Sequence, residues 1–244
     1  MTVRAASRHL PDPNLADVAA LIGDPTRSAM LLALLDGGAL PASELAYRSA
    51  ASPQAASGHL HRLVRGKLLT VAAAGRQRLY RLTTREVARA IEALLSLADP
   101  TPIVALNQHT AMQRLREARL CYDHLAGRLG VALADALVAR GLLRAGDAEF
   151  RVTPRGERFF REIGIDVADL RTRRRPLARP CMDWTERRPH LAGSLGMHLG
   201  DRFLANAWVV RHPRDRSLRL TERGRRAVMR VFGLDAASVP GGSG

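Results

Sequence analysis

Residues 52–69 of the chain read SPQAASGHLHRLVRGKLL, and this stretch decides the fold of its first part. Ala56, Leu60 and Leu63 recur at the spacing that brings apolar residues to one side of an α-helix. The residues around them are mostly polar or small, so the opposite side has no comparable apolar stripe. We expect a helix from about Pro53 to Arg65 that packs by one side and leaves the other exposed.

The exposed side of this predicted helix has the composition of a surface that approaches DNA. Small and hydrogen-bonding side chains near a helix N-terminus allow the helix to enter the major groove and reach base edges. An ordinary solvated face is the alternative, and for His59 packing is the alternative to a phosphate contact. The DNA-contacting residues that we predict in this segment are Ser52, Gln54, Ala55, Ser57, Gly58, His59, His61 and Arg62.

A basic β-hairpin is predicted directly after the helix. Residues 68–71 and 76–82 have the composition of strands, and the segment between them ends in a glycine. Arg76 and Arg78 then lie near the tip, where they can reach the DNA backbone or the minor groove. Because another helix is expected from Pro41, the order of elements is that of a winged helix-turn-helix.

Three further helices complete this predicted domain. The first covers residues 14–22, and the second opens at Asp24 and Pro25, which suit the N-cap and first position of a helix. The last helix begins at Thr83 or Thr84. It carries an apolar stripe made of Val87, Ile91, Leu94, Leu95 and Ala98.

Residues 14–98 resemble the ArsR/SmtB family of bacterial transcriptional regulators. The resemblance is carried by GDPTRSAMLLALL, by SPQAASGHLHRLVRGKLL with its Ser57-x-His59-Leu60-x-x-Leu63 pattern, and by GRQRLYRLT. It implies a homodimer that binds an inverted-repeat operator in double-stranded DNA, and a repressor that a signal releases. It also implies dimerisation through the first and last helices of this domain, at Leu15, Val18, Ile22, Val87, Ile91, Leu94 and Leu95.

The chain departs from the metal sensors of that family. Those proteins carry cysteines in the third helix, or carboxylate and histidine ligands in the last one. Here the third helix reads PASELAYRSA without a cysteine, and the last reads TREVARAIEALLSLAD without a histidine. We therefore expect the receptor for any signal elsewhere in the chain.

A phrase of seven residues occurs twice, as HLAGRLG at 124–130 and HLAGSLG at 190–196. The similarity extends downstream, where FRVTPRGERFF matches LRLTERGRRAV. We expect each copy to run helix, turn, helix, hairpin and Thr-capped helix, with Gly130 and Gly196 at the turns. The helices that correspond to the DNA-reading helix are apolar and carry an Asp, so we expect them to pack rather than bind DNA. Chance similarity is the alternative.

The predicted fold is therefore mainly α with small β-hairpin wings, and it has four parts. Residues 1–13 form a flexible N-terminal arm, and residues 14–99 form the winged helix-turn-helix domain for DNA binding and dimerisation. Residues 103–235 form a C-terminal sensor domain of two degenerate winged-helix-like repeats, about 112–166 and 181–235, and residues 236–244 form a flexible tail.

The two cysteines of the chain occupy matching places in the two copies, and each is followed by an Asp and a His. We expect Cys121 and His124 to lie three residues apart on one helix. If the copies pack about a pseudo-twofold axis, two thiolates and two imidazoles hold a tetrahedral metal, bind a metalloid, or form a redox-switched disulfide. Buried packing is the alternative, and a small organic effector then binds between the apolar helices. The candidate sensing residues are Cys121, His124, Cys181, Asp183 and His190.

Composition narrows the class of partner. A formal net charge of +15, from 38 basic and 23 acidic residues, favours a polyanion such as nucleic acid. No apolar run approaches the ~20 residues that span a bilayer, and the N-terminus has no secretory signal. Two cysteines do not make a disulfide framework, so we expect a cytoplasmic protein without a membrane partner.

The sequence thus predicts a DNA-binding transcriptional regulator and no enzymatic activity. A Cys–His-dependent enzyme is an alternative, but no third orienting group accompanies Cys121 and His124 in the sequence. A non-specific, nucleoid-type DNA binder is another, and it would bind without operator preference. The sequence identifies no cofactor beyond a metal or metalloid at the cysteines.

Overall fold

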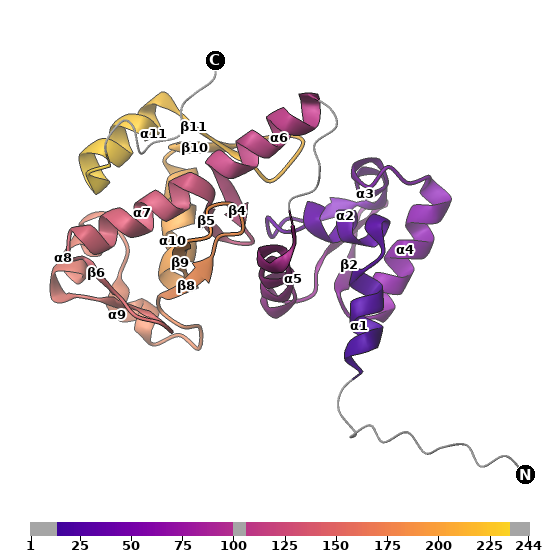
Figure 1. Cartoon of the computed structure of the whole chain (residues 1–244), viewed down its shortest axis with the longest axis horizontal. Helices are drawn as coiled ribbons and strands as arrows, with labels where there is room; N and C mark the ends of the chain where they lie inside the picture. The colour runs from indigo at the N-terminus through magenta and orange to yellow at the C-terminus, as the bar shows by residue number, and fades with distance from the viewer. Residues whose placement is uncertain (1–13, 100–105, 235–244) are drawn as a thin grey trace, which may run out of the picture. The chain divides into compact units, whose positions relative to one another are not determined.

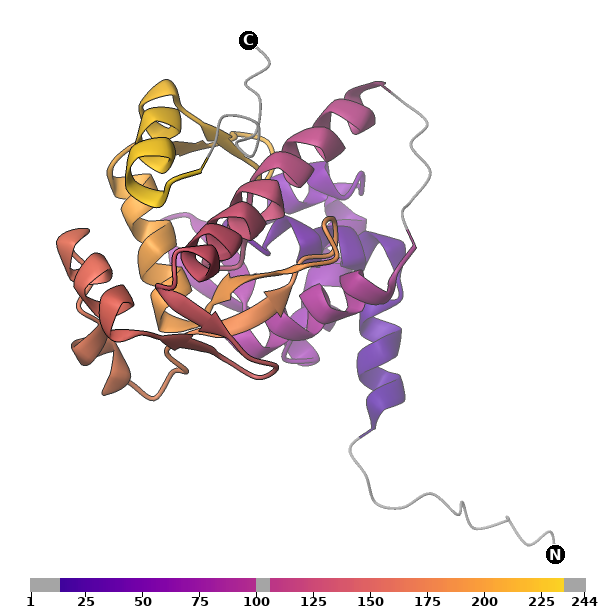
Figure 2. The same ribbon diagram turned by 60° about the vertical axis from the view of Figure 1, so that its left-hand side comes forward.

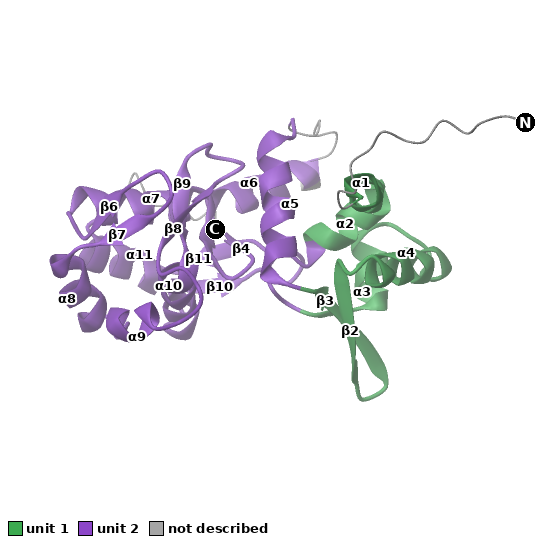
Figure 3. Cartoon of the chain, turned by 90° about the horizontal axis from the view of Figure 1, so that it is seen from below, with its two compact units in different colours: residues 1–32, 39–83 green, residues 33–38, 84–244 purple. Residues whose placement is uncertain are grey.

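The computed structural model describes residues 14–99 and 106–234 (Figure 1). The predicted arm, residues 1–13, and the predicted tail, residues 236–244, lie outside the described residues. The chain divides into two compact units, residues 1–32 with 39–83 and residues 33–38 with 84–244 (Figure 3). Each unit is described by itself.

Unit 1 is built from short helices and one small sheet. The helices are α1 (Leu15–Ile22), α2 (Pro25–Ala33), α3 (Ala42–Arg48) and α4 (Pro53–Arg65). The strands β1 (Leu40–Pro41), β2 (Leu69–Ala74) and β3 (Gln77–Leu82) form an antiparallel sheet in the order β1-β3-β2. Helix α4 begins where its N-cap Ser52 accepts a hydrogen bond from Ala55 N at 3.3 Å. The predicted winged helix-turn-helix is confirmed.

The wing is the β2–β3 hairpin. Its pairing runs from Leu69 opposite Leu82 to Ala74 opposite Gln77, which leaves two residues for the turn. The first of them is Gly75, whose φ of +60° is readily available to glycine. The apolar side of α4 and both strands contribute to a core that includes Met30, Leu31, Leu45, Ala56, Leu60, Leu63, Leu69 and Leu82.

Within its described residues, unit 2 contains the remaining helices and four two-stranded hairpins (Figures 1 and 2). Its helices are α5 (Arg85–Leu97), α6 (Leu106–Glu117), α7 (Gly127–Ala139), α8 (Pro154–Glu162), α9 (Val167–Arg171), α10 (Gly193–Ala205), α11 (Glu222–Ala227) and the π-helical turn η1 (Val228–Phe232). Its hairpins are β4 (Arg119–Cys121) with β5 (His124–Ala126), β6 (Leu143–Ala145) with β7 (Phe150–Val152), β8 (Arg179–Met182) with β9 (Pro189–Ala192), and β10 (Val209–Arg211) with β11 (Leu218–Leu220).

The helices α4, α7 and α10 have 13 residues each and are followed by the same local structure. Past each helix end stands a residue with positive φ, namely Lys67, Gly141 and Ala207. The next residue donates its N–H to the carbonyl five positions back: Leu68 to Leu63, Leu142 to Leu137 and Trp208 to Phe203. A hairpin follows in each case, and then a helix capped by a threonine: Thr84, Thr153 and Thr221.

The prediction for the start of each repeated segment was wrong. His124–Ala126 is a strand, and α7 runs from Gly127 through Gly130 without a turn. Cys121 and His124 therefore face each other across the β4–β5 hairpin and do not share a helix. The second copy has the same arrangement, with Cys181 opposite His190.

Close backbone packing explains both glycines of the first repeated phrase. Gly127 has a φ of +73°, and a Cβ built there would lie 2.6 Å from the carbonyl oxygen of Arg116. A Cβ at Gly130 would lie 2.5 Å from the carbonyl oxygen of Leu125. A glycine within a helix costs about 1 kcal/mol relative to alanine. At Gly130 strand β5 approaches too closely for any larger residue. The repeated seven-residue sequence therefore serves close packing.

The two copies pack reciprocally in unit 2. Helix α7 packs on β9 and α10 packs on β5, so each helix covers the hairpin of the other copy. The shared core includes Leu129, Leu133, Leu137, Phe160, Leu195, Leu199, Phe203 and Phe232. In the part of the chain that the structure describes, no helix is both long and apolar enough to cross a bilayer.

Candidate functional site

Helix α4 and the wing present the residues that the sequence predicts as DNA contacts. Ala56, Leu60 and Leu63 are buried on one side of α4. All but one of the contacts predicted in this segment are exposed. The exposed residues are Ser52, Gln54, Ala55, Ser57, Gly58, His61 and Arg62. Arg76 and Arg78 are exposed at the wing.

His59 is the exception, because it is half-buried and faces the start of α2. Its Nδ1 lies 3.6 Å from Oδ1 of Asp24 and 3.5 Å from Nη1 of Arg27. The Arg27 backbone N–H donates to the Asp24 carboxylate and, with the Arg27 and His59 charges, holds the pKa of Asp24 below its usual value. This surrounding favours a packing role for His59.

Gly58 lies in the middle of α4 and is exposed. A Cβ built at Gly58 would meet nothing within 4 Å, so packing does not require a glycine there. Since a glycine destabilises a helix interior, its presence needs another reason. Close approach of an external surface to the α4 backbone supplies one.

The residues predicted at a dimer interface differ in exposure. Leu15 is 77% exposed, Val18 39% and Leu94 47%, whereas Ile91 is only 4% exposed. Ile22, Val87 and Leu95 are half-buried. Ile91 is therefore a core residue of the single chain, and the exposed leucines and valine are the members free to meet a partner.

The hairpins β4–β5 and β8–β9 bring together Cys121, His124, Cys181 and His190 in unit 2. In each hairpin the cysteine and the histidine are direct cross-strand partners. The two Sγ atoms are 3.9 Å apart and the two Nε2 atoms are 3.1 Å apart. One ligand atom from each of the four residues lies within 4.8 Å of all the others. Cys181 is half-buried and the other three residues are buried.

The glycines of the repeated phrase allow this approach. A Cβ at Gly130 would lie 3.6 Å from Cβ of His190, and a Cβ at Gly196 would lie 3.5 Å from Cβ of His124. Each helix glycine thus sits against the histidine of the other copy. The glycines that let the repeated segments pack closely therefore also let the four side chains come together.

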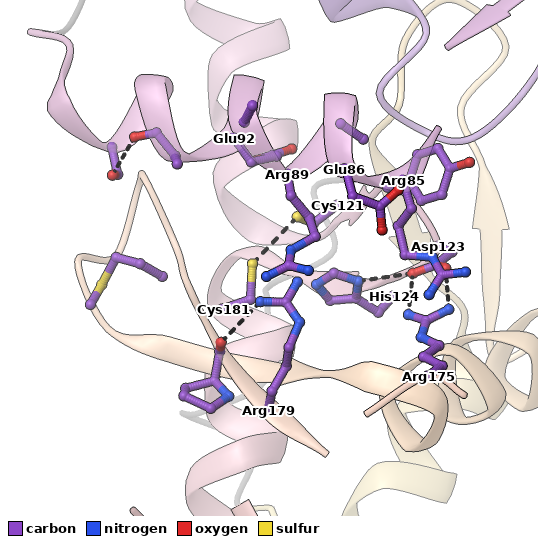
Figure 4. Close-up of a pocket in the computed structure, with 17 residues that line it drawn as sticks. Arg85, Glu86, Arg89, Glu92, Cys121, Asp123, His124, Arg175, Arg179 and Cys181 are labelled. Carbon is purple, nitrogen blue, oxygen red and sulfur yellow. Dashed lines mark hydrogen bonds and ion pairs between the residues drawn. The ribbon is translucent and has the colours of Figure 1, made fainter. Parts of the chain in front are cut away.

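A carboxylate forms a hydrogen bond with Nδ1 of His124. Nδ1 of His124 lies 3.1 Å from Oδ1 of Asp123, and Arg175 donates to both oxygens of that carboxylate at 2.6 and 3.0 Å (Figure 4). Burial raises the pKa of Asp123, but the hydrogen bonds from His124 and Arg175 outweigh it and hold the pKa well below its usual range. Asp123 is therefore a fixed anion beside the imidazole.

The second histidine has an equivalent carboxylate. Nδ1 of His190 lies 3.4 Å from Oδ2 of Asp183, whose side chain is fully buried. The same oxygen accepts a hydrogen bond from Gly127 N at 2.7 Å and lies 3.0 Å from a guanidinium nitrogen of Arg119. Burial raises the pKa of Asp183, but Arg119 and its other partners hold that pKa well below the usual range. Asp183 joins the two copies, because it contacts residues of both hairpins.

The two thiols are inequivalent. Against the effect of burial, the hydrogen bond from Cys121 and the nearby histidines lower the pKa of the Cys181 thiol well below its usual value. The same hydrogen bond and burial raise the pKa of Cys121. Of the two thiols, Cys181 is therefore the more acidic, and its Sγ lies within hydrogen-bond distance of Sγ of Cys121.

A cavity of about 540 Å³ reaches the two cysteines (Figure 4). It is lined by α5, by residues 121–124 and by residues around β8. Its charged wall residues are Arg85, Glu86, Arg89, Glu92, Asp123, Arg175 and Arg179. The cluster can therefore be reached from one side, where it can hold a tetrahedral cation. A disulfide would require the sulfurs to move from 3.9 Å to about 2.05 Å apart.

Two arginines of the site have no signal in the sequence. Arg119 is completely buried and lies over the Trp184 ring at 4.6 Å, where it pairs with Asp183. Arg175 belongs to the basic run RTRRR at 171–175, for which the sequence predicts a solvated connector or, as the alternative, a phosphate contact beside the operator. Both are found only once the tertiary fold supplies their carboxylate partners.

Comparison with known proteins places the chain among DNA-binding regulators. Residues 22–72 match a family model described as a helix-turn-helix domain. Over 214 residues, 88% of this chain and 95% of the relative, the chain is 44% identical to the protein called "Uncharacterized HTH-type transcriptional regulator YdfF" of Bacillus subtilis. That similarity extends well beyond the helix-turn-helix domain.

Solved structures match the N-terminal third of the chain. The cadmium metal-sensor CMTR from Mycobacterium tuberculosis is 32% identical, with 38% of this chain and 99% of that chain covered and a TM-score of 0.31. A homodimeric winged helix-turn-helix domain from Mycobacterium bovis, described as a possible ArsR-family regulator, is 27% identical. There the match covers 34% of this chain and 74% of that one, with a TM-score of 0.30.

Proposed function

This chain belongs to the ArsR/SmtB family of winged helix-turn-helix transcriptional regulators, and from this premise we propose that it is a dimeric, sequence-specific repressor released by a signal. Residues 14–99 bind an inverted-repeat operator and dimerise, and residues 103–235 receive the signal. The observation that carries the proposal is the exposed polar side of α4 beside an arginine-bearing wing.

The operator contacts divide into two kinds. Gln54 and Ser57 lie on the first two turns of α4, and their side chains can form hydrogen bonds with base edges in the major groove. Arg62, Arg76 and Arg78 are exposed cations that suit phosphates or the minor groove. The open side of Gly58 allows the α4 backbone to approach the groove closely.

Dimerisation rests on the exposed apolar residues of α1 and α5. Leu15 and Leu94, at 77% and 47% exposure, are large apolar side chains left in water by the single chain. A twofold interface would cover them and space two α4 helices for half-sites about 34 Å apart. Leu94→Asp should yield monomers in analytical ultracentrifugation with little operator affinity. Ile91→Asp would instead unfold the chain, because Ile91 is already buried.

The C-terminal domain is the receiver in this proposal. Helices α7 and α10 precede hairpins and Thr-capped helices as α4 does, which supports reading residues 112–166 and 181–235 as degenerate winged-helix-like repeats. Their inner faces are buried in a common core, so these helices do not offer the free polar side that α4 has. The family assignment favours this regulatory role over a Cys–His enzyme.

The test is DNA binding by the full-length protein. Fluorescence anisotropy should detect tight binding to the segment upstream of the chain's own gene, with at least ~10³-fold weaker binding to a random duplex at the same salt concentration. Equal affinity for both duplexes would contradict the proposal and favour a nucleoid-type binder. Gln54→Ala should relax specificity, whereas Arg78→Ala should weaken both kinds of binding.

A further inference from the structure

We propose that Cys121, His124, Cys181 and His190 bind one thiophilic divalent cation of the zinc class in tetrahedral geometry. We also propose that this cation is the signal. The second statement rests on the proposed repressor function, whereas the first stands on the geometry of unit 2 alone. Neither helix that holds the metal ligands of the family's known sensors contributes a ligand here.

The sulfur pair and the nitrogen pair are each spaced as in a tetrahedral site. Zinc bonds of about 2.3 Å to sulfur and about 2.05 Å to nitrogen imply about 3.8 Å between two thiolates and about 3.3 Å between two imidazole nitrogens. The observed separations are 3.9 Å for the sulfurs and 3.1 Å for the nitrogens. All four ligand atoms lie within 4.8 Å of one another, so a cation would keep these two spacings and draw the sulfurs closer to the nitrogens.

The histidines point the correct nitrogen at this centre. Each Nδ1 faces a carboxylate, at 3.1 Å in His124 and at 3.4 Å in His190, and a carboxylate can only accept a hydrogen bond. In neutral His124 the proton is thereby placed on Nδ1, where it donates to Asp123, whereas Nδ1 of His190 makes no hydrogen bond. The two Nε2 atoms lie 3.1 Å apart, within hydrogen-bond distance, and a cation between them would take the place of the proton that they share.

The residues behind the two histidines are of the kind that orient the ligands of a bound metal. Carboxylate–histidine pairs orient metal ligands and raise their basicity in many zinc proteins. Here Asp123 and Asp183 have this position, and each is fixed by an arginine, Arg175 and Arg119. Packing alone gives no reason to bury the Arg119–Asp183 pair completely and the Arg175–Asp123 pair partly behind two histidines, because a buried pair is seldom more stable than apolar residues of the same volume.

The donor set selects the class of ion. Two sulfurs and two imidazoles suit zinc, cadmium and cobalt(II), whereas magnesium and calcium require oxygen ligands. The four ligands come from matched positions of two hairpins, so the ion would join β4–β5 to β8–β9. Binding of an ion at these ligands would therefore add metal bonds between the two repeated segments.

Arg216 links strand β4 to the helix that follows the wing. Arg216 pairs with Glu92 of α5 and donates to the carbonyl oxygen of Leu120, the neighbour of Cys121. Only two residues separate helix α5 from Leu82, the last residue of the wing strand β3. A cation that fixes Cys121 therefore acts on a strand linked by an ion pair to α5, and α5 carries the exposed Leu94 proposed for dimerisation.

The first experiment measures metal binding alone. Full-length, reduced, chelator-treated protein is titrated with Co²⁺, and then with Zn²⁺. We expect one Co²⁺ per chain, with the visible bands of a tetrahedral ion and a thiolate charge-transfer band, both removed by Zn²⁺. Zn²⁺ should also protect both wild-type thiols from alkylation, a readout that needs no variant.

Variants locate the ion. Cys121→Ser/Cys181→Ser and His124→Gln/His190→Gln should abolish the tetrahedral Co²⁺ spectrum, and His109→Gln, exposed on α6, is the matched control that keeps it. Absence of Co²⁺ binding by wild type, unprotected thiols, or an unchanged spectrum in the cysteine variant would overturn the site. Formation of a disulfide by an oxidant without any metal binding would also overturn it.

The second experiment measures operator affinity with and without Zn²⁺. We expect Zn²⁺ to weaken operator binding by wild type on the order of tenfold or more, and to leave the cysteine variant bound. If the metal spectrum appears and operator affinity does not change, the cation is not the signal. If no form of the protein prefers the operator, the proposed repressor function fails while the metal result stands.

Discussion

Helix α4 of unit 1 and helices α7 and α10 of unit 2 share length, ending and following hairpin, but they differ in what they bury. Helix α4 buries three residues, Ala56, Leu60 and Leu63. Helices α7 and α10 bury seven each. The same local arrangement therefore leaves one side of α4 exposed and builds a core from α7 and α10, and side-chain composition decides which.

Glycines show the same difference at single positions. Gly58 of α4 has open space where a Cβ would stand, whereas Gly130 of α7 has a strand carbonyl 2.5 Å away. The first glycine leaves room for an external partner, and the second leaves room for the chain itself. The following predictions test this contrast, from the largest expected effect to the smallest.

Asp183→Ala should have the largest effect on unit 2. It would leave the completely buried Arg119 without its anion, and breaking a buried pair in this way costs about 3–5 kcal/mol. Chemical denaturation should show the loss. Asp201→Ala, at an exposed position of α10, should change stability by less than about 0.5 kcal/mol. Similar results for the two variants would contradict the account of the buried cluster.

Gly130→Ala should destabilise the protein by about 1–3 kcal/mol. The added Cβ meets the backbone oxygen of Leu125, which cannot move without disturbing β5 and His124. The variant should also lose affinity for Co²⁺, because His190 lies beside Gly130. Thermal denaturation and cobalt titration check both effects. Wild-type stability in this variant would mean that the helix–strand approach is looser than described.

Gln54→Ala should leave the stability of the fold unchanged and affect operator recognition. Loss of one base contact should cost about 1–3 kcal/mol of operator affinity and relax the preference at one base position. Arg78→Ala is the comparison variant, which should weaken specific and random binding alike and reduce the salt slope by about one. If Gln54→Ala lost equal affinity for both duplexes, Gln54 would not be a base-reading residue.

Gly58→Ala should have the smallest effect, and the opposite sign on folding from Gly130→Ala. Since nothing lies within 4 Å of the new Cβ, the protein should gain about 0.5–1 kcal/mol of stability. Operator affinity should fall, because the methyl group separates α4 from the groove. A variant that is both more stable and equally tight on DNA would show that the helix backbone does not approach DNA at this point.

The winged helix-turn-helix was predictable because its signals are local. The Ser52 cap, the spacing of Ala56, Leu60 and Leu63, and the arginines of the wing each act within a few residues. The predicted helix from Pro53 to Arg65 has the bounds of α4.

The hairpins of unit 2 were missed for a physical reason. Buried strands of only three residues, such as His124–Ala126, have the same pattern as the first turn of a buried helix. The glycines of the phrase favoured a turn, although tertiary packing places Gly130 inside α7. The site residues Arg119 and Arg175 depend on partners that are 64 and 52 positions away, so no local pattern identifies them.

Hydrogen–deuterium exchange on the full-length protein tests the contrast between α4 and the repeated helices most directly. The account predicts that operator DNA protects amides of α4 and of the wing tip, and leaves α7 and α10 unchanged. It predicts that Zn²⁺ protects β4–β5 and β8–β9 in the absence of DNA. Protection of α7 or α10 by DNA, or none at α4, would contradict the account.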